Sequence, residues 1–269
     1  MPTVSHCGAS LYYETSGADD TSERDESAGT DGHAGSADPV VFVPDLGCGV
    51  WLWGWQAPAL AGPREAITWD LRGCGRSGGE PADSIATMAG DLEAVLADCG
   101  VSSAAVVGAG MGGMVALQYA LDYSRTGRLV LFGATADGAR FDAGAFLGDP
   151  GDLDALTSAG FREAYPDAID DIAAWREAED ASEAGKRAHA AAVAGCDLSG
   201  RLHEITQPAL VAHGEADTVV PIEAGEALAG GLPRGSVERF AEGSHFFFVE
   251  QARLVSDVVA GFLEAEDGR

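Results

Sequence analysis

A run of small residues at positions 106–113 has the composition of a turn that presents a catalytic side chain. It reads Val-Val-Gly-Ala-Gly-Met-Gly-Gly and stands where an apolar strand-like run gives way to a helical pattern. In the nucleophile-elbow motif G-x-S-x-G, a sharp turn between strand and helix holds a central nucleophile, and small flanking residues let the turn close. Gly108 and Gly112 occupy the flanking positions, and Gly110 occupies the nucleophile position. Because glycine has no side chain, no covalent acyl intermediate can form at this residue.

The elements that would position this turn alternate between strand and helix patterns, which is typical of a mostly parallel sheet covered by helices. Strands are predicted at Val40–Val43, Ala66–Trp69, Ala104–Val107, Leu129–Phe132, Ala209–Ala212 and Val237–Phe240. Helical spacing of apolar residues marks Ile85–Cys99, Met111–Tyr123, Glu223–Leu232 and Glu250–Glu264. An antiparallel hairpin of Thr3–Cys7 and Ser10–Glu14 is predicted at the sheet edge. The sequence therefore predicts an α/β fold with a central sheet of about eight strands.

Two segments interrupt the alternation. Residues 18–38 contain almost no large apolar side chain, so they are predicted to form an acidic, disordered loop. Residues 137–201 are rich in Ala, Asp and Glu and helical in pattern, and they are predicted to form a small helical cap inserted after a sheet strand. We expect one domain over residues 1–269, since α/β folds of this length are commonly single units.

The composition excludes several classes of partner. Acidic residues number 43 against 16 basic ones, a net charge of −27, so nucleic acid is not expected as a partner. The only lysine is Lys186, and such dense carboxylates with so little lysine are typical of salt-accumulating halophiles.

The five cysteines show no metal or disulfide spacing, and neither a metal nor an organic cofactor is expected. No stretch approaches the ~18 apolar residues of a membrane span, so we expect a cytoplasmic protein; the oligomeric state stays open.

Further motifs appear in a fixed order along the chain. They are L-Y-Y-E-T-S-G at 11–17, D-L-R-G-C-G-R-S at 70–77, H-G-E-A-D-T-V-V-P at 213–221 and G-S-H-F-F-F-V-E at 243–250. Together with the elbow, they make the chain resemble the α/β-hydrolase superfamily, in particular its small esterase, enol-lactonase and haloperoxidase-like branch. The resemblance covers nearly the whole chain except the acidic loop and the cap.

The resemblance implies a catalytic acid and a catalytic base. The order in this superfamily is nucleophile, acid, histidine, so Asp217 resembles the acid and His245 the base. A carboxylate that accepts from one imidazole nitrogen fixes the tautomer and leaves the other nitrogen available for proton transfer. We expect the two side chains to lie within hydrogen-bond reach of each other and to face Gly110. The alternatives are a turn residue for Asp217 and a buried, hydrogen-bonded histidine for His245.

The loop after the third strand is a second departure from the resemblance. The superfamily often has His-Gly there, whereas this chain has Val43-Pro44-Asp45-Leu46-Gly47. Oxyanion donors are expected from this loop, at Leu46, and from Met111 after the elbow. A charged Asp45 about 5 Å away would oppose an oxyanion by roughly 3 kcal/mol at an effective dielectric of about 20. Alternatively, Asp45 points to solvent or caps the loop. Trp51 follows this loop, and we expect its ring either to line an apolar pocket or to pack in the core.

These observations leave two main hypotheses and a lesser one. The first is an enzyme that acts on a small acyl, enol or lactone compound through the Asp217–His245 pair as general base, without a nucleophilic serine. The second is a non-catalytic relative that binds a small ligand or a protein in the same cleft. A degraded serine hydrolase with trace turnover is the third, and fold alone does not choose among them.

The excess charge predicts that folding depends on salt. Because 27 excess negative charges repel one another until screened, and the Debye length falls to about 3 Å at 1 M, the thermal midpoint should rise with KCl. Circular dichroism melts between about 0.1 and 2 M KCl measure this. An unchanged midpoint would contradict halophilic adaptation.

Overall fold

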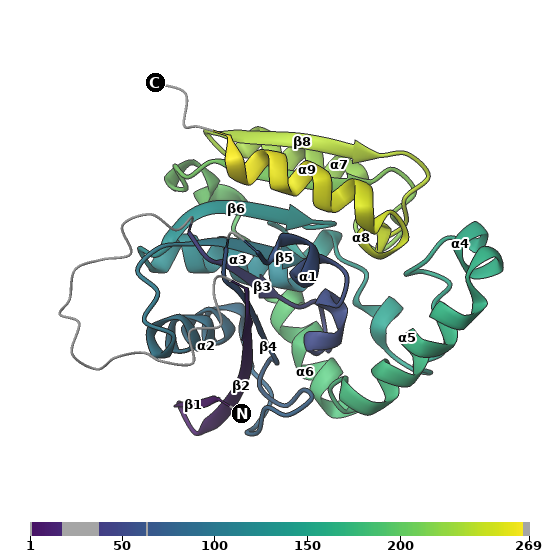
Figure 1. Cartoon of the computed structure of the whole chain (residues 1–269), viewed down its shortest axis with the longest axis horizontal. Coiled ribbons are helices and arrows are strands. Elements are labelled where there is room, and N and C mark those ends of the chain that lie inside the picture. Colours follow the sequence, from purple (N-terminus) through teal and green to yellow (C-terminus); the bar gives the residue numbers. More distant parts are fainter. Residues whose placement is uncertain (1, 18–37, 63, 266–269) are drawn as a thin grey trace.

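The computed structural model describes residues 2–17, 38–62 and 64–265, and these residues contain one sheet of eight strands with helices on both faces (Figure 1). The strands are β1 (Thr3–His6), β2 (Ala9–Ser16), β3 (Val40–Val43), β4 (Ala66–Trp69), β5 (Ala104–Ala109), β6 (Thr126–Phe132), β7 (Ala209–Gly214) and β8 (Gly235–Phe240). Their order is β1-β2-β4-β3-β5-β6-β7-β8; the pairs β1–β2 and β2–β4 are antiparallel, and all other pairs, from β4–β3 to β7–β8, are parallel. The predicted α/β class is confirmed.

Helices cover the two faces according to the direction of each crossover. The α-helices are α1 (Gln56–Leu60), α2 (Ile85–Asp98), α3 (Met111–Asp122), α4 (Ala159–Ala164), α5 (Pro166–Glu179), α6 (Glu183–Ala194), α7 (Ile222–Gly231), α8 (Phe247–Glu250) and α9 (Ala252–Glu264). The step from β3 to β4 runs one way along the sheet, and the steps from β4 to β8 run the other way. Right-handed crossovers therefore place α1 on one face and α2, α3 and α7 on the other. Contacts between α1 and α9 put α9 on the α1 face.

The reversal at β3 determines where a site can form. Loops that leave the carboxyl ends of β3 and β5 diverge to opposite faces, because their helices lie on opposite sides of the sheet. Such a switch point leaves a crevice between the two loops, and ligands of open α/β sheets bind there. The two sequence departures, at Asp45 after β3 and Gly110 after β5, both lie at this point.

The segment predicted to form a cap, residues 137–201, lies between β6 and β7 and is called the cap below. It contains short 3-10 turns, η2 (Gly138–Arg140) and η3 (Ala143–Phe146), followed by α4, α5, α6 and η4 (Ser199–Glu204). An antiparallel bridge between Asp137 and Asp197 joins the two ends of this segment. The helices α4 and α5 stand beyond the end of the sheet in Figure 1. The predicted acidic loop, residues 18–38, lies outside the described residues apart from Asp38.

Some predicted boundaries differ from the structure. The strand predicted at 129–132 begins earlier, at Thr126, and the strand predicted at 237–240 begins at Gly235. The helix predicted over 250–264 begins two residues later, as α9, because the backbone of Gln251 leaves the helical region and separates it from the short helix α8, which was not predicted. Within the described residues, no helix is both long and apolar enough to cross a membrane.

Close packing of α3 against the loop after β3 requires glycine at position 112. A Cβ atom there would lie closer than 3.0 Å to the carbonyl oxygens of Val43 and Pro44, which are backbone atoms that cannot turn away. Gly112→Ala should therefore lower the free energy of unfolding by about 1–3 kcal/mol, the usual cost of overpacking. Urea denaturation in molar KCl measures it. The matched control is Gly261→Ala in α9, where a Cβ meets nothing within 4 Å and stability should stay equal or rise.

Candidate active site

The turn between β5 and α3 has the backbone of a nucleophile elbow. Gly110 has φ 49° and ψ −112°, a positive-φ conformation that L side chains rarely adopt and glycine reaches without strain. Its N–H donates to Phe132 O at 2.8 Å, which holds the turn against β6. The sequence therefore folds into the elbow, but with no side chain at its tip.

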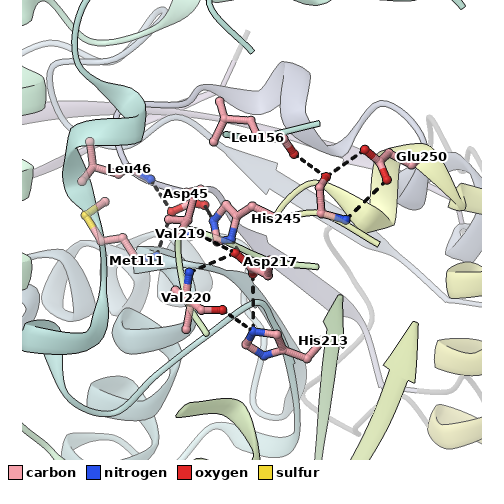
Figure 2. Close-up of polar contacts among 11 residues, drawn as sticks. Asp45, Leu46, Met111, Leu156, His213, Asp217, Val219, Val220, His245 and Glu250 are labelled. Carbon is pink, nitrogen blue, oxygen red and sulfur yellow. Dashed lines mark hydrogen bonds and ion pairs between the residues drawn. The ribbon is translucent and has the colours of Figure 1, made fainter. Parts of the chain in front are cut away.

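The carboxylate of Asp45 fills the space beside this elbow. Its Oδ1 accepts from the backbone N–H groups of Leu46 at 2.7 Å and Met111 at 2.8 Å, and its Oδ2 accepts from His245 Nε2 at 2.8 Å (Figure 2). The side chain is completely buried. The sequence predicts these same two N–H groups as oxyanion donors, so Oδ1 of Asp45 lies where the sequence would place an oxyanion. The alternative in which Asp45 points to solvent is wrong.

His245 links Asp45 to a second buried carboxylate. Its Nδ1 donates to Asp217 Oδ2 at 2.8 Å, and the ring is only 1% exposed. The other oxygen of Asp217, Oδ1, accepts from the backbone N–H groups of Val219 and Val220 at 2.9 Å each. The histidine thus stands between two acidic side chains, with both ring nitrogens hydrogen-bonded.

The neighbouring acidic side chains set the protonation of His245, and His245 in turn sets that of Asp217. Burial alone would lower the pKa of His245, but the charges and hydrogen bonds of Asp217 and Asp45 outweigh it and raise this pKa to about 10. Burial alone would raise the pKa of Asp217, but His245 and a hydrogen bond from His213 hold it well below its usual value. At neutral pH, His245 is therefore an imidazolium between two carboxylates.

Gly110 and Asp45 are sterically coupled. A Cβ atom built on Gly110 would lie closer than 3.0 Å to Oδ1, Oδ2 and Cγ of Asp45. Three hydrogen bonds fix this carboxylate, so it cannot move aside cheaply. The two departures found in the sequence therefore meet at one point in space, and Asp45 can take its position only because residue 110 is a glycine.

Contacts with the cap hold the loop that carries Asp45. The N–H of Ala181 donates to Gly47 O at 2.7 Å, and the N–H of Gly47 donates to His189 Nδ1 at 3.3 Å. Burial lowers the pKa of His189 to about 4, so the ring is neutral and can accept this bond. The chain of Lys186 packs on Gly47, and its Nζ pairs with Asp180 at 3.3 Å. The cap thereby fixes the backbone next to Asp45.

A second set of contacts holds the loop that carries His245. Ser244 Oγ donates to Leu156 O at 2.6 Å and lies 2.8 Å from Glu250 Oε1. The N–H of Phe246 donates to the same Leu156 oxygen at 2.8 Å, and the N–H of Ser158 donates to Glu250. Residues on both sides of His245 are therefore tied to the start of the cap.

Aromatic rings surround the imidazole. Phe141 and Phe146 stand edge-on to it, with ring centroids 6.1 and 5.8 Å away, and Phe246 stacks at 5.9 Å. The surroundings of the three charged groups are thus apolar, which strengthens their mutual attraction. Trp51 is 7% exposed; its Nε1 donates to Asp180 Oδ1 at 2.9 Å, and its ring packs near Phe246. It joins the cap to the loop rather than contacting Asp45 or His245 by any hydrogen bond.

Sequence reasoning missed two further residues that shape the site. His213 Nε2 donates to Val220 O at 2.8 Å and lies 3.4 Å from Asp217 Oδ2. Glu250 anchors Ser244, next to His245. Both stand within motifs quoted above, at the first position of 213–221 and the last of 243–250, and that position was the available signal. Among the described residues, no group of three or more His, Cys, Asp or Glu side chains could hold a metal ion.

The chain is similar to a known protein family and to individual proteins of other organisms. The profile of the family described as "Alpha/beta hydrolase family" matches residues 40–258. A protein of Variovorax paradoxus that bears the name "Putative carbamate hydrolase RutD" is 34% identical over 247 residues, covering 83% of this chain and 91% of that protein. RutD of Caulobacter vibrioides is 30% identical over 241 residues, covering 84% and 90%.

Solved structures agree on the fold. A protein described as an N-acyl homoserine lactone degrading enzyme superimposes with a TM-score of 0.80 at 26% identity, covering 97% of this chain and all of that one. The enol-lactonase of Burkholderia xenovorans superimposes with a TM-score of 0.83 at 23% identity, covering 98% of this chain and all of that one, and shows the fold alone. With the matched profile spanning most of its length, this chain belongs to the alpha/beta hydrolase family.

Proposed function

We propose that this chain acts on a small acyl, enol or lactone compound, with Asp217 and His245 as its proton-transfer pair and without a serine at the elbow. The observation that carries the proposal is the position of His245: Nδ1 is held by Asp217, and Nε2 faces the point where the N–H groups of Leu46 and Met111 converge. Relatives named for carbamate and lactone chemistry support a small carbonyl compound as substrate.

The protonation state of His245 in the resting protein limits how the Asp217–His245 pair can act. Because Asp217 and Asp45 together raise the pKa of His245, and Asp45 accepts the proton on Nε2, this nitrogen has no free lone pair until Asp45 is neutralised or displaced. Proton abstraction by His245 therefore has to follow an event at Asp45. Since Asp45 and His245 are buried, a compound reaches them only if cap side chains such as Phe141 or Phe146 move.

The second candidate function is a non-catalytic protein that binds a small ligand or a protein partner in the same cleft. One specific observation favours it: Asp45 occupies both oxyanion donors and the imidazole at once, as a bound carboxylate product would. In this case the three charged groups serve only to hold the loops together.

The composition favours the same cellular location for either function. Its net charge of −27 and single lysine are the features that favour the cytoplasm of a salt-accumulating cell. The assays below therefore use molar KCl.

An activity screen separates the two candidates. Activated esters, enol lactones, β-lactones and carbamates are offered to the protein and to His245→Ala. We expect turnover of at least one class, lowered by about 10²–10⁴-fold in the variant because general acid–base catalysis is lost. Equal rates for both proteins, with circular dichroism showing both folded, would favour the binding function.

Restoring serine should fail unless Asp45 is also removed. In Gly110→Ser the new side chain meets the Asp45 carboxylate, so we expect lower stability and no labelling by a fluorophosphonate. The double variant Asp45→Gly, Gly110→Ser frees the oxyanion donors and the imidazole, and it should be labelled at residue 110. Its hydrolysis of an activated ester should exceed that of the single variant by about a hundredfold. Labelling of the single variant to the same extent would refute the steric coupling.

The protonation of His245 can be measured directly. NMR titration of its ring signals should show an imidazolium through pH 8 in the unaltered protein, because its pKa is about 10. In Asp45→Asn the nearby charge is gone, so the pKa should fall by about 1–3 pH units. His203, which is exposed, serves as the internal reference that should not change. A neutral His245 at pH 7 in the unaltered protein would contradict the ion triplet.

A further inference from the structure

We propose that Asp45 is the covalent nucleophile of this site, supplied by the loop after β3 in place of a side chain at the elbow, and that its substrates are small strained lactones opened at their saturated carbon. This inference rests on the proposed function and names its nucleophile and its substrate class.

The surroundings of Asp45 are those of a reacting carboxylate. Oδ1 sits on two backbone N–H groups, while Oδ2 lies 2.8 Å from the imidazole that would serve the second step. Carboxylates are established as covalent nucleophiles in enzymes. A loop-capping role would need one backbone N–H; here the second donor comes from Met111, 66 residues away in the chain, and the third from His245.

The position of the oxyanion donors selects the kind of bond that Asp45 can form. Both N–H groups are already on Oδ1, so the carbonyl oxygen of a substrate finds no donor there during attack at its acyl carbon. Displacement at a saturated carbon develops no such oxyanion. If Oδ2 forms an ester to that carbon, Oδ1 becomes the carbonyl oxygen of the ester. This oxygen is then already hydrogen-bonded to both oxyanion donors, so the donors favour hydrolysis of the ester.

The leaving group follows from the nucleophile. A carboxylate is weakly basic and expels only groups of similar basicity from a saturated carbon, and the ring carboxyl of a lactone is such a group. Ring strain, as in a four-membered β-lactone, supplies the driving force. The phenylalanine rings around His245 suit a small apolar ring better than a charged compound.

The atoms balance in two steps. In the first, Oδ2 forms a bond to the ring carbon, the bond from that carbon to the ring oxygen breaks, and its electron pair leaves a free carboxylate on the substrate. Asp45 is now a neutral ester, so His245 loses one of the charges that raise its pKa and releases its Nε2 proton to solvent.

In the second step, water attacks Cγ of Asp45 while Nε2 takes its proton, and the negative charge develops on Oδ1 between the N–H groups of Leu46 and Met111. The bond from Cγ to Oδ2 breaks, and the departing alkoxide takes the proton from His245. The acid form of Asp45 then returns its proton to the imidazole. The sum is lactone plus water giving a hydroxycarboxylate and one proton.

The test uses (R)-β-butyrolactone in ¹⁸O-water, with enzyme in excess for the first turnover. Attack by Asp45 predicts 3-hydroxybutyrate of inverted configuration, no ¹⁸O in its carboxyl group, and ¹⁸O in the peptide that contains Asp45. In His245→Gln the ester should accumulate, giving an adduct of one butyrolactone mapped to Asp45 by mass spectrometry. The matched control, Asp45→Asn with His245→Gln, should give none.

The other outcomes of this experiment distinguish failure of this inference from failure of the proposed function. Hydrolysis that depends on His245 but gives retained configuration and ¹⁸O in the product carboxyl would overturn the role of Asp45 and leave the proposed function standing. An adduct on another residue would also overturn it. Absence of both turnover and adduct, with turnover absent for every compound in the screen above, would overturn this inference and the proposed function together.

Discussion

The buried carboxylate of Asp45 is the group on which the arrangement of this site depends. An unpaired charge removed from water costs several kcal/mol or more, so a side chain with no exposure needs full compensation. Three donors supply it, and they come from three separate places in the fold: the loop after β3, the start of α3 and the loop before α8. The segments after β3 and β5 meet where the direction of the crossovers reverses, and cap contacts at Gly47 and Leu156 hold the loops that carry Asp45 and His245.

An anion in this position changes the chemistry of the histidine beside it. When a neutral serine lies beside the histidine, the imidazole is neutral in the resting site, and its free nitrogen can act as a base at once. Here Asp217 and Asp45 surround His245 and raise its pKa to about 10, so the imidazole is protonated at neutral pH and Nε2 has no free lone pair while Asp45 accepts its proton. Asp217 has its own backbone donors at Val219 and Val220, and His245 beside it holds the pKa of Asp217 well below its usual value.

The fold could be predicted from sequence because it depends on local, repeated signals. Alternating strand and helix patterns gave eight strands, and the small residues around Gly110 marked the elbow. The site could be predicted only in part. The pairing of Asp217 with His245 followed from motif order, but the place of Asp45 depends on a contact with Met111 across 66 residues, which no local pattern encodes. Sequence reasoning considered Asp45 and Gly110 as separate departures, whereas in space they touch.

That contact makes the two departures a single physical change. With any side chain at residue 110, its Cβ atom excludes the Asp45 carboxylate from the oxyanion donors. With glycine at 110 and no acid at 45, the same donors and the imidazole face an empty space, and the N–H groups lose an acceptor in a buried place, which is costly. Each residue therefore has its favourable effect only in the presence of the other, so their energetic effects cannot add, as is general for residues in direct contact. The glycine at position 110 and the carboxylate on the neighbouring loop therefore form one structural feature, in which a hydrogen-bonded acidic side chain lies in front of His245.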